Sequence, residues 1–139
     1  MVTDSLVEDI TPEHFADVMN LNVRAPLLMV QHVLPHFRRP GRIINIASAA
    51  AREGMRATGT YAASKAALEG YTRNWAVELG HDGTTVNCVN PGPVQSEMLD
   101  RISPAIVDDQ KRRTPIQNRL GTAEEIAVRQ PERDISHPL

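Results

Sequence analysis

The sequence is poor in several residue types, and each shortage excludes a class of protein. Its 139 residues include one cysteine, Cys88, so no internal disulfide can form and a reducing compartment is expected. Aromatic residues make up 4% of the chain and hydrophobic residues 41%, which predicts a globular core built mainly from aliphatic side chains and alanine. No run approaches the roughly 20 apolar residues of a membrane-spanning helix, and the amino terminus does not resemble a signal peptide. We therefore expect a soluble, cytoplasmic protein that does not contact membranes.

The sequence also lacks a large excess of charge of either sign. The net charge is −2 and the isoelectric point about 6.2, so no basic field recruits nucleic acid or anionic lipid. The local basic cluster at residues 111–113 fits the solvated face of a helix. No nucleic-acid or membrane partner is therefore expected.

The order of helical and extended segments predicts an α/β fold. A helix is expected to begin with a cap at Thr11 and a proline at the next position. Its apolar residues recur with a helical period: Phe15, Val18, Met19, Val23, Leu27, Val30 and Leu34. A buried strand is expected over residues 42–47, then a helix of about twenty residues that closes near Gly80, then a second strand in "TTVNCVN". Short helices are expected beyond it, the last opened by a capping box of Thr122 and Glu125.

Two strands joined by a helix form a βαβ unit with parallel strands. A parallel sheet needs cover on both faces, and two strands make a poor finished domain. We therefore expect residues 1–127 to be part of a larger domain, followed by a divergent, disordered tail at 128–139 that is polar and broken by prolines. The chain alone is expected to be unstable or to associate, because unpaired strand edges invite other chains.

A tyrosine and a lysine stand four residues apart in "TYAASKAAL". In a helix, positions i and i+4 share a face, so Tyr61 and Lys65 can meet one pocket. A phenol has a pKa of about 10, too high for a base at neutral pH, and a nearby ammonium stabilises the phenolate. Ser48 follows the first strand and the Pro91-Gly92 turn follows the second, and ligands gather at such strand ends. Ser48, Tyr61 and that turn are predicted to line one cleft, with Lys65 one helical turn behind.

Pro26 lies inside the first helical pattern. A proline there removes the hydrogen bond to the residue four back, which frees the carbonyl of Asn22 to bind a water leading toward Lys65. A tolerated kink is the simpler alternative. His32 and His36 also have helical spacing, but Pro35 interrupts the turn and no third ligand is near, so no metal site is expected.

These motifs together resemble those of one enzyme family. Asn22 in "NLNVRAP", Ser48 in "INIASAA", Tyr61 and Lys65 in "YAASK", and the segment "NPGPVQSEM" resemble the short-chain dehydrogenase/reductase family, with a match over about residues 8–127. The resemblance implies the carboxyl-terminal half of a Rossmann-type, doubly wound parallel sheet. It also implies an oxidoreductase that interconverts a small secondary alcohol and a ketone with NAD(H) or NADP(H), NADP(H) being slightly favoured, as in 3-oxoacyl reductases.

The resemblance also implies a role for each matching residue. Tyr61 would be the general acid/base and Ser48 the hydroxyl that polarises the substrate oxygen. Lys65 would bind the nicotinamide ribose beside Tyr61, and Asn22 would serve the proton relay. The cofactor loop beside the nicotinamide would be formed by Pro91, Gly92, Val94 and Ser96, the last replacing the usual threonine. A homo-oligomer would form through the helices around 22–36 and 60–79 if the full domain is present.

The sequence departs from the family pattern in its glycines. The eight glycines form no TGxxxGxG loop, whose backbone amides would hold the pyrophosphate, so this chain is expected to bind dinucleotide weakly or not at all. An inactive fragment that pairs with a full-length relative is therefore the alternative function. The extended nucleotide-sugar epimerase branch shares Ser, Tyr and Lys, but "NVRAP" and the short spacing to "NPGPV" favour the shorter branch. A hydrolase using Ser48 and Lys65 lacks the GxSxG nucleophile elbow.

Overall fold

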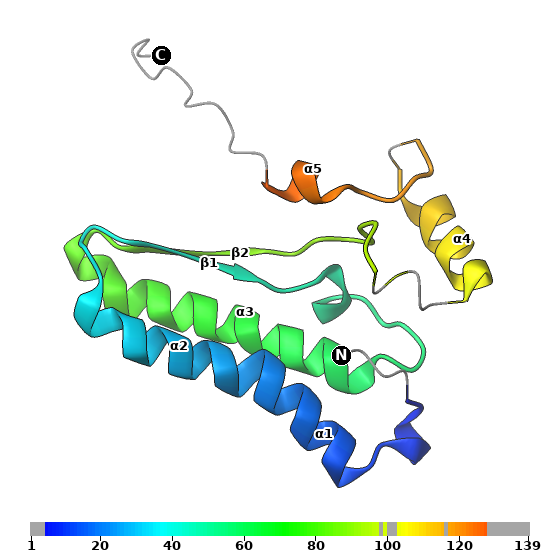
Figure 1. The fold of residues 1–139 in the computed structure, drawn as a ribbon, viewed down its shortest axis with the longest axis horizontal. Helices are drawn as coiled ribbons and strands as arrows, with labels where there is room; N and C mark the ends of the chain where they lie inside the picture. Colours follow the sequence, from blue (N-terminus) through cyan, green and yellow to red (C-terminus); the bar gives the residue numbers. More distant parts are fainter. Residues whose placement is uncertain (1–4, 98, 100–102, 116, 128–139) are drawn as a thin grey trace. The chain divides into compact units, whose positions relative to one another are not determined.

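The structure is a computed structural model that describes residues 5–97, 99, 103–115 and 117–127 (Figure 1). The chain divides into two compact units, Met1–Pro91 and Gly92–Leu139. The tail predicted at 128–139 lies outside the described residues, and the domain boundary at 127 stays a prediction. None of the described helices is both long enough and apolar enough to cross a membrane.

The first helical segment begins as predicted and then departs from a single α-helix. Helix α1, Pro12–Met19, starts after Thr11, whose hydroxyl accepts a hydrogen bond of 3.1 Å from the backbone N–H of His14. A π-helical turn, η2 (Asn20–Arg24), separates it from α2 (Ala25–Val33). In that turn the Ala25 N–H donates to the Asn20 carbonyl, five residues back.

The predicted apolar stripe is buried only in part. In α1, Val18 is 4% exposed but Phe15 is 50% exposed. The remaining stripe residues are half-buried: Met19, Val23, Leu27, Val30 and Leu34.

The two strands and the helix between them form the predicted βαβ unit. Strands β1 (Arg42–Ile46) and β2 (Thr85–Val89) pair in parallel, with Arg42 opposite Thr85 and Ile46 opposite Val89. Helix α3, Gly59–Leu79, connects them through the short 3-10 turns η4 (Ala49–Ala51) and η5 (Gly80–Asp82). It packs along both strands, and α1 and α2 lie on the same side of the sheet (Figure 1).

The core of the first unit is built around α3, which packs against both strands and against α1. Its buried hydrophobic residues are mostly small or aliphatic, as predicted: Val18, Ala47, Ala50, Leu68, Trp75 and Val86. Trp75 is the exception in size, and its ring stacks on Tyr71 with the centroids 5.0 Å apart. On the other face of β1, Ile44 and Ile46 are exposed. The association predicted from the sequence stays a prediction.

The second unit contains helices α4 (Pro104–Arg113) and α5 (Ala123–Ala127). Val94 and Gly121 form an isolated parallel bridge. The basic residues of the 111–113 cluster are ion-paired with Asp108 and Asp109, as expected on a solvated face. Part of the segment beyond β2 in which short helices are expected, residues 98 and 100–102, lies outside the described residues.

The capping box predicted from Thr122 and Glu125 is confirmed. The Glu125 N–H donates to the Thr122 hydroxyl at 3.3 Å, and the Thr122 N–H donates to the Glu125 carboxylate at 2.9 Å. Arg119 adds two hydrogen bonds to the same carboxylate, at 2.9 and 2.6 Å. These bonds lower the pKa of Glu125 to about 2, with the largest effect from the Arg119 hydrogen bonds and a smaller one from the Thr122 N–H.

We expect NMR titration of the Glu125 carboxyl carbon to give a midpoint near this lowered pKa. Because the pKa in the folded chain is below the ordinary value of 4.5, the contribution to stability is present above 4.5 and is lost as the pH falls through about 2. In Arg119→Met the midpoint should move toward the ordinary value. An unchanged midpoint in that variant would contradict the assigned cause.

Candidate active site

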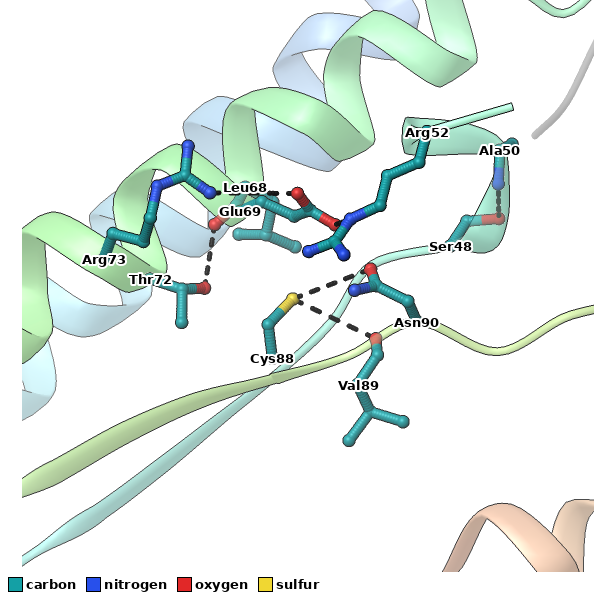
Figure 2. A network of polar contacts seen from close by, with 10 residues as sticks. All are labelled: Ser48, Ala50, Arg52, Leu68, Glu69, Thr72, Arg73, Cys88, Val89 and Asn90. Carbon is teal, nitrogen blue, oxygen red and sulfur yellow. Dashed lines mark hydrogen bonds and ion pairs between the residues drawn. The ribbon is translucent and has the colours of Figure 1, made fainter. Parts of the chain in front are cut away.

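Ser48 lies just beyond the carboxyl end of β1, where the parallel pairing continues past the strands. The Ala47 N–H donates to the Val89 carbonyl at 2.8 Å, and the Ala49 N–H donates to the Pro91 carbonyl at 2.9 Å. Ser48 is the N-cap of η4, and its hydroxyl accepts a hydrogen bond of 3.2 Å from the Ala50 N–H (Figure 2). The structure therefore places Ser48 and Pro91 on adjacent segments at the same sheet edge.

Lys65 connects helix α3 to this edge. Its ammonium donates a 3.0 Å hydrogen bond to the carbonyl of Ile46, the last residue of β1. The same ammonium lies 5.7 Å from the centroid of the Tyr61 ring, within the range of a cation–π contact. Burial lowers the pKa of Lys65, and the nearby Cys88 opposes that shift. Lys65 thus lies between the Tyr61 ring and the backbone that leads to Ser48.

Asn22 contacts the site through a serine that the sequence reasoning missed. The Asn22 side-chain amide donates to the Ser64 hydroxyl at 3.1 Å, and that hydroxyl donates to the Tyr61 carbonyl at 2.7 Å. Ser64 is fully buried. The signal for it was a polar residue directly before Lys65 in an alanine-rich stretch.

The predicted cofactor loop crosses from one compact unit into the other. Pro91 ends the first unit, and Gly92, Val94 and Ser96 belong to the second. Within the second unit, the Gly121 N–H donates to the Pro93 carbonyl and the Gln95 N–H donates to the Gly121 carbonyl, both at 2.9 Å. The Ser96 carbonyl accepts a bond of the same length from the Leu99 N–H. The single cleft predicted from Ser48, Tyr61 and the Pro91-Gly92 turn stays a prediction.

A buried carboxylate lies one helical turn beyond Lys65. Glu69 is 8% exposed, and its carboxylate pairs with the Arg52 Nε at 3.0 Å and with the Arg73 Nη1 at 3.8 Å (Figure 2). The sequence pattern assigns no role to Glu69 or Arg52, because charged side chains usually face water.

The cysteine and the histidines that the sequence raised as candidates do not form a reactive or metal-binding group among the described residues. Cys88 is half-buried, and its thiol lies 3.9 Å from the Asn90 side-chain oxygen and 4.0 Å from the Val89 carbonyl (Figure 2). The His32 ring nitrogen lies 2.7 Å from the Leu28 carbonyl on its own helix. Among the described residues, no group of three or more His, Cys, Asp or Glu side chains could hold a metal ion.

A large hollow lies within the second unit. It has a volume of about 770 Å³ and is lined by apolar and charged side chains, including Leu99, Val107, Asp108, Lys111 and Leu120. Its size is that of a small-molecule pocket, but its Asp108 and Lys111 are paired with each other. The residues with catalytic chemistry, Ser48, Tyr61 and Lys65, do not line it.

Comparisons with known proteins agree on one family. A sequence model of the family described as enoyl-(acyl carrier protein) reductase matches residues 2–128. A short-chain dehydrogenase/reductase, FrzI, of a Cladobotryum species is 46% identical over 134 residues, which cover 91% of this chain and 52% of the relative. The dehydrogenase OXI1 of Cochliobolus heterostrophus is 43% identical over 83% of this chain and 52% of its own length.

Solved structures give the same result. A short-chain dehydrogenase/reductase from Serratia marcescens superposes with a TM-score of 0.85 at 34% identity, over 91% of this chain and 51% of that one. The angucycline C-6 ketoreductase LanV, solved with bound NADP, superposes with a TM-score of 0.84 at 29% identity, over 91% and 49%. The chain therefore spans about half the length of the curated relatives that it matches.

Proposed function

The chain belongs to the short-chain dehydrogenase/reductase family, and on that premise we propose that it carries the proton-transfer residues of an NAD(P)-dependent oxidoreductase acting on a secondary alcohol and its ketone. Its fold is a partial Rossmann-type fold. One observation supports the proposal above the others. The Lys65 ammonium is anchored at the end of β1, two residues before Ser48, and lies near the Tyr61 ring.

Each of these side chains has a hydrogen-bond donor or an exchangeable proton available for its proposed role. Ser48 accepts a hydrogen bond from Ala50, so its own hydroxyl hydrogen is left to donate to a substrate oxygen. An ammonium has three donors, and the bond to the Ile46 carbonyl uses one, which leaves donors for ribose hydroxyls. The Tyr61 phenol would exchange a proton with the substrate oxygen. A bound nicotinamide ring would supply or accept the hydride.

Asn22 would support this group in two ways. Its amide, through Ser64, holds the backbone of Tyr61. Its carbonyl has no α-helical donor, because residue 26 is proline and has no N–H. That carbonyl is therefore suited to accept a hydrogen bond from a water in a proton relay toward Lys65.

We expect the chain by itself to bind NADPH or NADH more weakly than micromolar. Lys65, Tyr61 and the loop from Pro91 to Ser96 would serve the nicotinamide half only, and the eight glycines form no TGxxxGxG loop for the pyrophosphate. Titration followed by cofactor fluorescence measures this. A micromolar dissociation constant, equivalent to about −8 kcal/mol, would contradict the account.

The proposed function is tested in a joined protein. In it, the part of the Cladobotryum relative that precedes the matched residues is placed ahead of this chain. We expect the joined protein to oxidise NADPH in the presence of small ketones. NADPH is the first cofactor to test, because the similar ketoreductase LanV was solved with NADP bound. A folded joined protein that binds NADPH and reduces no ketone would contradict the proposal and favour the inactive-fragment alternative.

A further inference from the structure

The turn that carries Ser48 is a short, hydrogen-bonded unit with Arg52 at its other end. The Ala51 N–H donates to the Ser48 carbonyl at 3.0 Å, and the Arg52 N–H donates to the Ala49 carbonyl at 2.9 Å. The Ser48 hydroxyl also accepts from the Ala50 N–H. Because these bonds link the turn from end to end, fixing Arg52 also restrains Ser48.

Arg52 is held by a carboxylate of helix α3. Its Nε donates to Glu69 Oε1 at 3.0 Å, although the Arg52 side chain is itself 69% exposed. Glu69 is 8% exposed, and a carboxylate with so little water around it needs a counterion. The second counterion, Arg73, is on the same helix and farther away, at 3.8 Å. Of the two arginines, only Arg52 connects Glu69 to another element.

Helix α3 therefore holds the Ser48 segment at two points. Lys65 binds the carbonyl of Ile46 before Ser48, and Glu69 binds the side chain of Arg52 after it. The two helix residues are one turn apart and share a face. The segment between these points contains Ser48 and the turn η4.

We propose that Arg52 and Glu69 are positioning residues that fix Ser48 relative to Tyr61 and Lys65. This inference rests on the proposed function, because it assigns the pair to the same site. Neither side chain needs to touch the substrate. Their pairing sets the orientation of the turn from which the Ser48 hydroxyl projects.

The pairing itself is tested by amide hydrogen exchange on the full 139-residue chain. In Arg52→Gln and in Glu69→Gln, the amides of Ala50 and Ala51 should exchange roughly tenfold faster, as in a local opening. The amides of Leu68 and Thr72 in α3 should be unchanged. Arg52→Lys, which keeps the charge, should restore slow exchange, and Arg73→Gln is the matched control that should have no effect. Equal exchange in Arg52→Gln and Arg73→Gln would overturn the inference.

The positioning role is tested in the joined protein. Arg52→Gln should lower kcat by roughly tenfold, within the range of misplaced catalytic groups, and leave the KM for NADPH unchanged. Arg52→Lys should recover most of the loss. An unchanged kcat in Arg52→Gln would overturn the positioning role. A wild-type joined protein without turnover would instead contradict the proposed function, and the exchange result would still decide whether the pair holds the turn.

Discussion

Replacing Tyr61 by phenylalanine should lower the turnover of the joined protein by about 10²–10⁴-fold, the usual contribution of a positioned proton donor. NADPH binding should be nearly unchanged, because the ring that lies 5.7 Å from the Lys65 ammonium is kept and only the hydroxyl is lost. A steady-state assay of ketone reduction measures the turnover, and a separate NADPH titration measures cofactor binding.

Tyr71→Phe provides a control with the same chemical change. Tyr71 is the other tyrosine of the chain, on the same helix, and its ring stacks on Trp75 rather than facing Lys65. We expect its turnover to match the unmodified joined protein. Lys65→Ala should lower both turnover and cofactor binding, because it removes the ammonium from the strand end. If Tyr61→Phe kept most of the activity, proton transfer by Tyr61 would have to be abandoned.

Replacing Trp75 by alanine should cost about 3–5 kcal/mol of folding free energy, the range for deleting a large buried aromatic side chain. The residue is 6% exposed and stacks on Tyr71. Domains have a total margin of only about 5–15 kcal/mol, so this change should leave the first unit barely folded or unfolded.

Urea unfolding followed by far-ultraviolet circular dichroism measures the loss without relying on the tryptophan itself. Val77→Ala is the control, since Val77 is on the same helix two residues away and is 82% exposed. It should shift the midpoint little. Equal shifts in the two variants would show that Trp75 is not the centre of this core.

The sequence was sufficient for features that depend on neighbouring residues. The cap at Thr11 and the capping box at Thr122 follow from the ability of a side chain to bond the free N–H groups of a helix start. The proximity of Ser48 to Pro91 follows from two parallel strands ending at one edge. These expectations needed only local chemistry and one rule of topology.

The features that the sequence did not predict depend on contacts between distant segments. Glu69 reads as a solvated helix residue until Arg52 is placed against it, and these two residues belong to different elements. Ser64 reads as a helix former until the Asn22 amide reaches it from another helix. Pro26 predicted a disturbed helix, and the structure has a π-helical turn just before the proline.

That π-helical turn also affects how relatives of slightly different length should be aligned with this chain. An α-helix advances by about 100° per residue, since it has 3.6 residues per turn. Because the π-helical turn holds one residue more than an α-helical turn, deleting one residue within Asn20–Arg24 would let the α-helical ladder run on into α2 with its side chains in about the same phase relative to α1. Relatives that differ by one residue in this segment should therefore be aligned with the gap placed inside the turn. Moving the gap into α1 or α2 would match core positions to exposed ones.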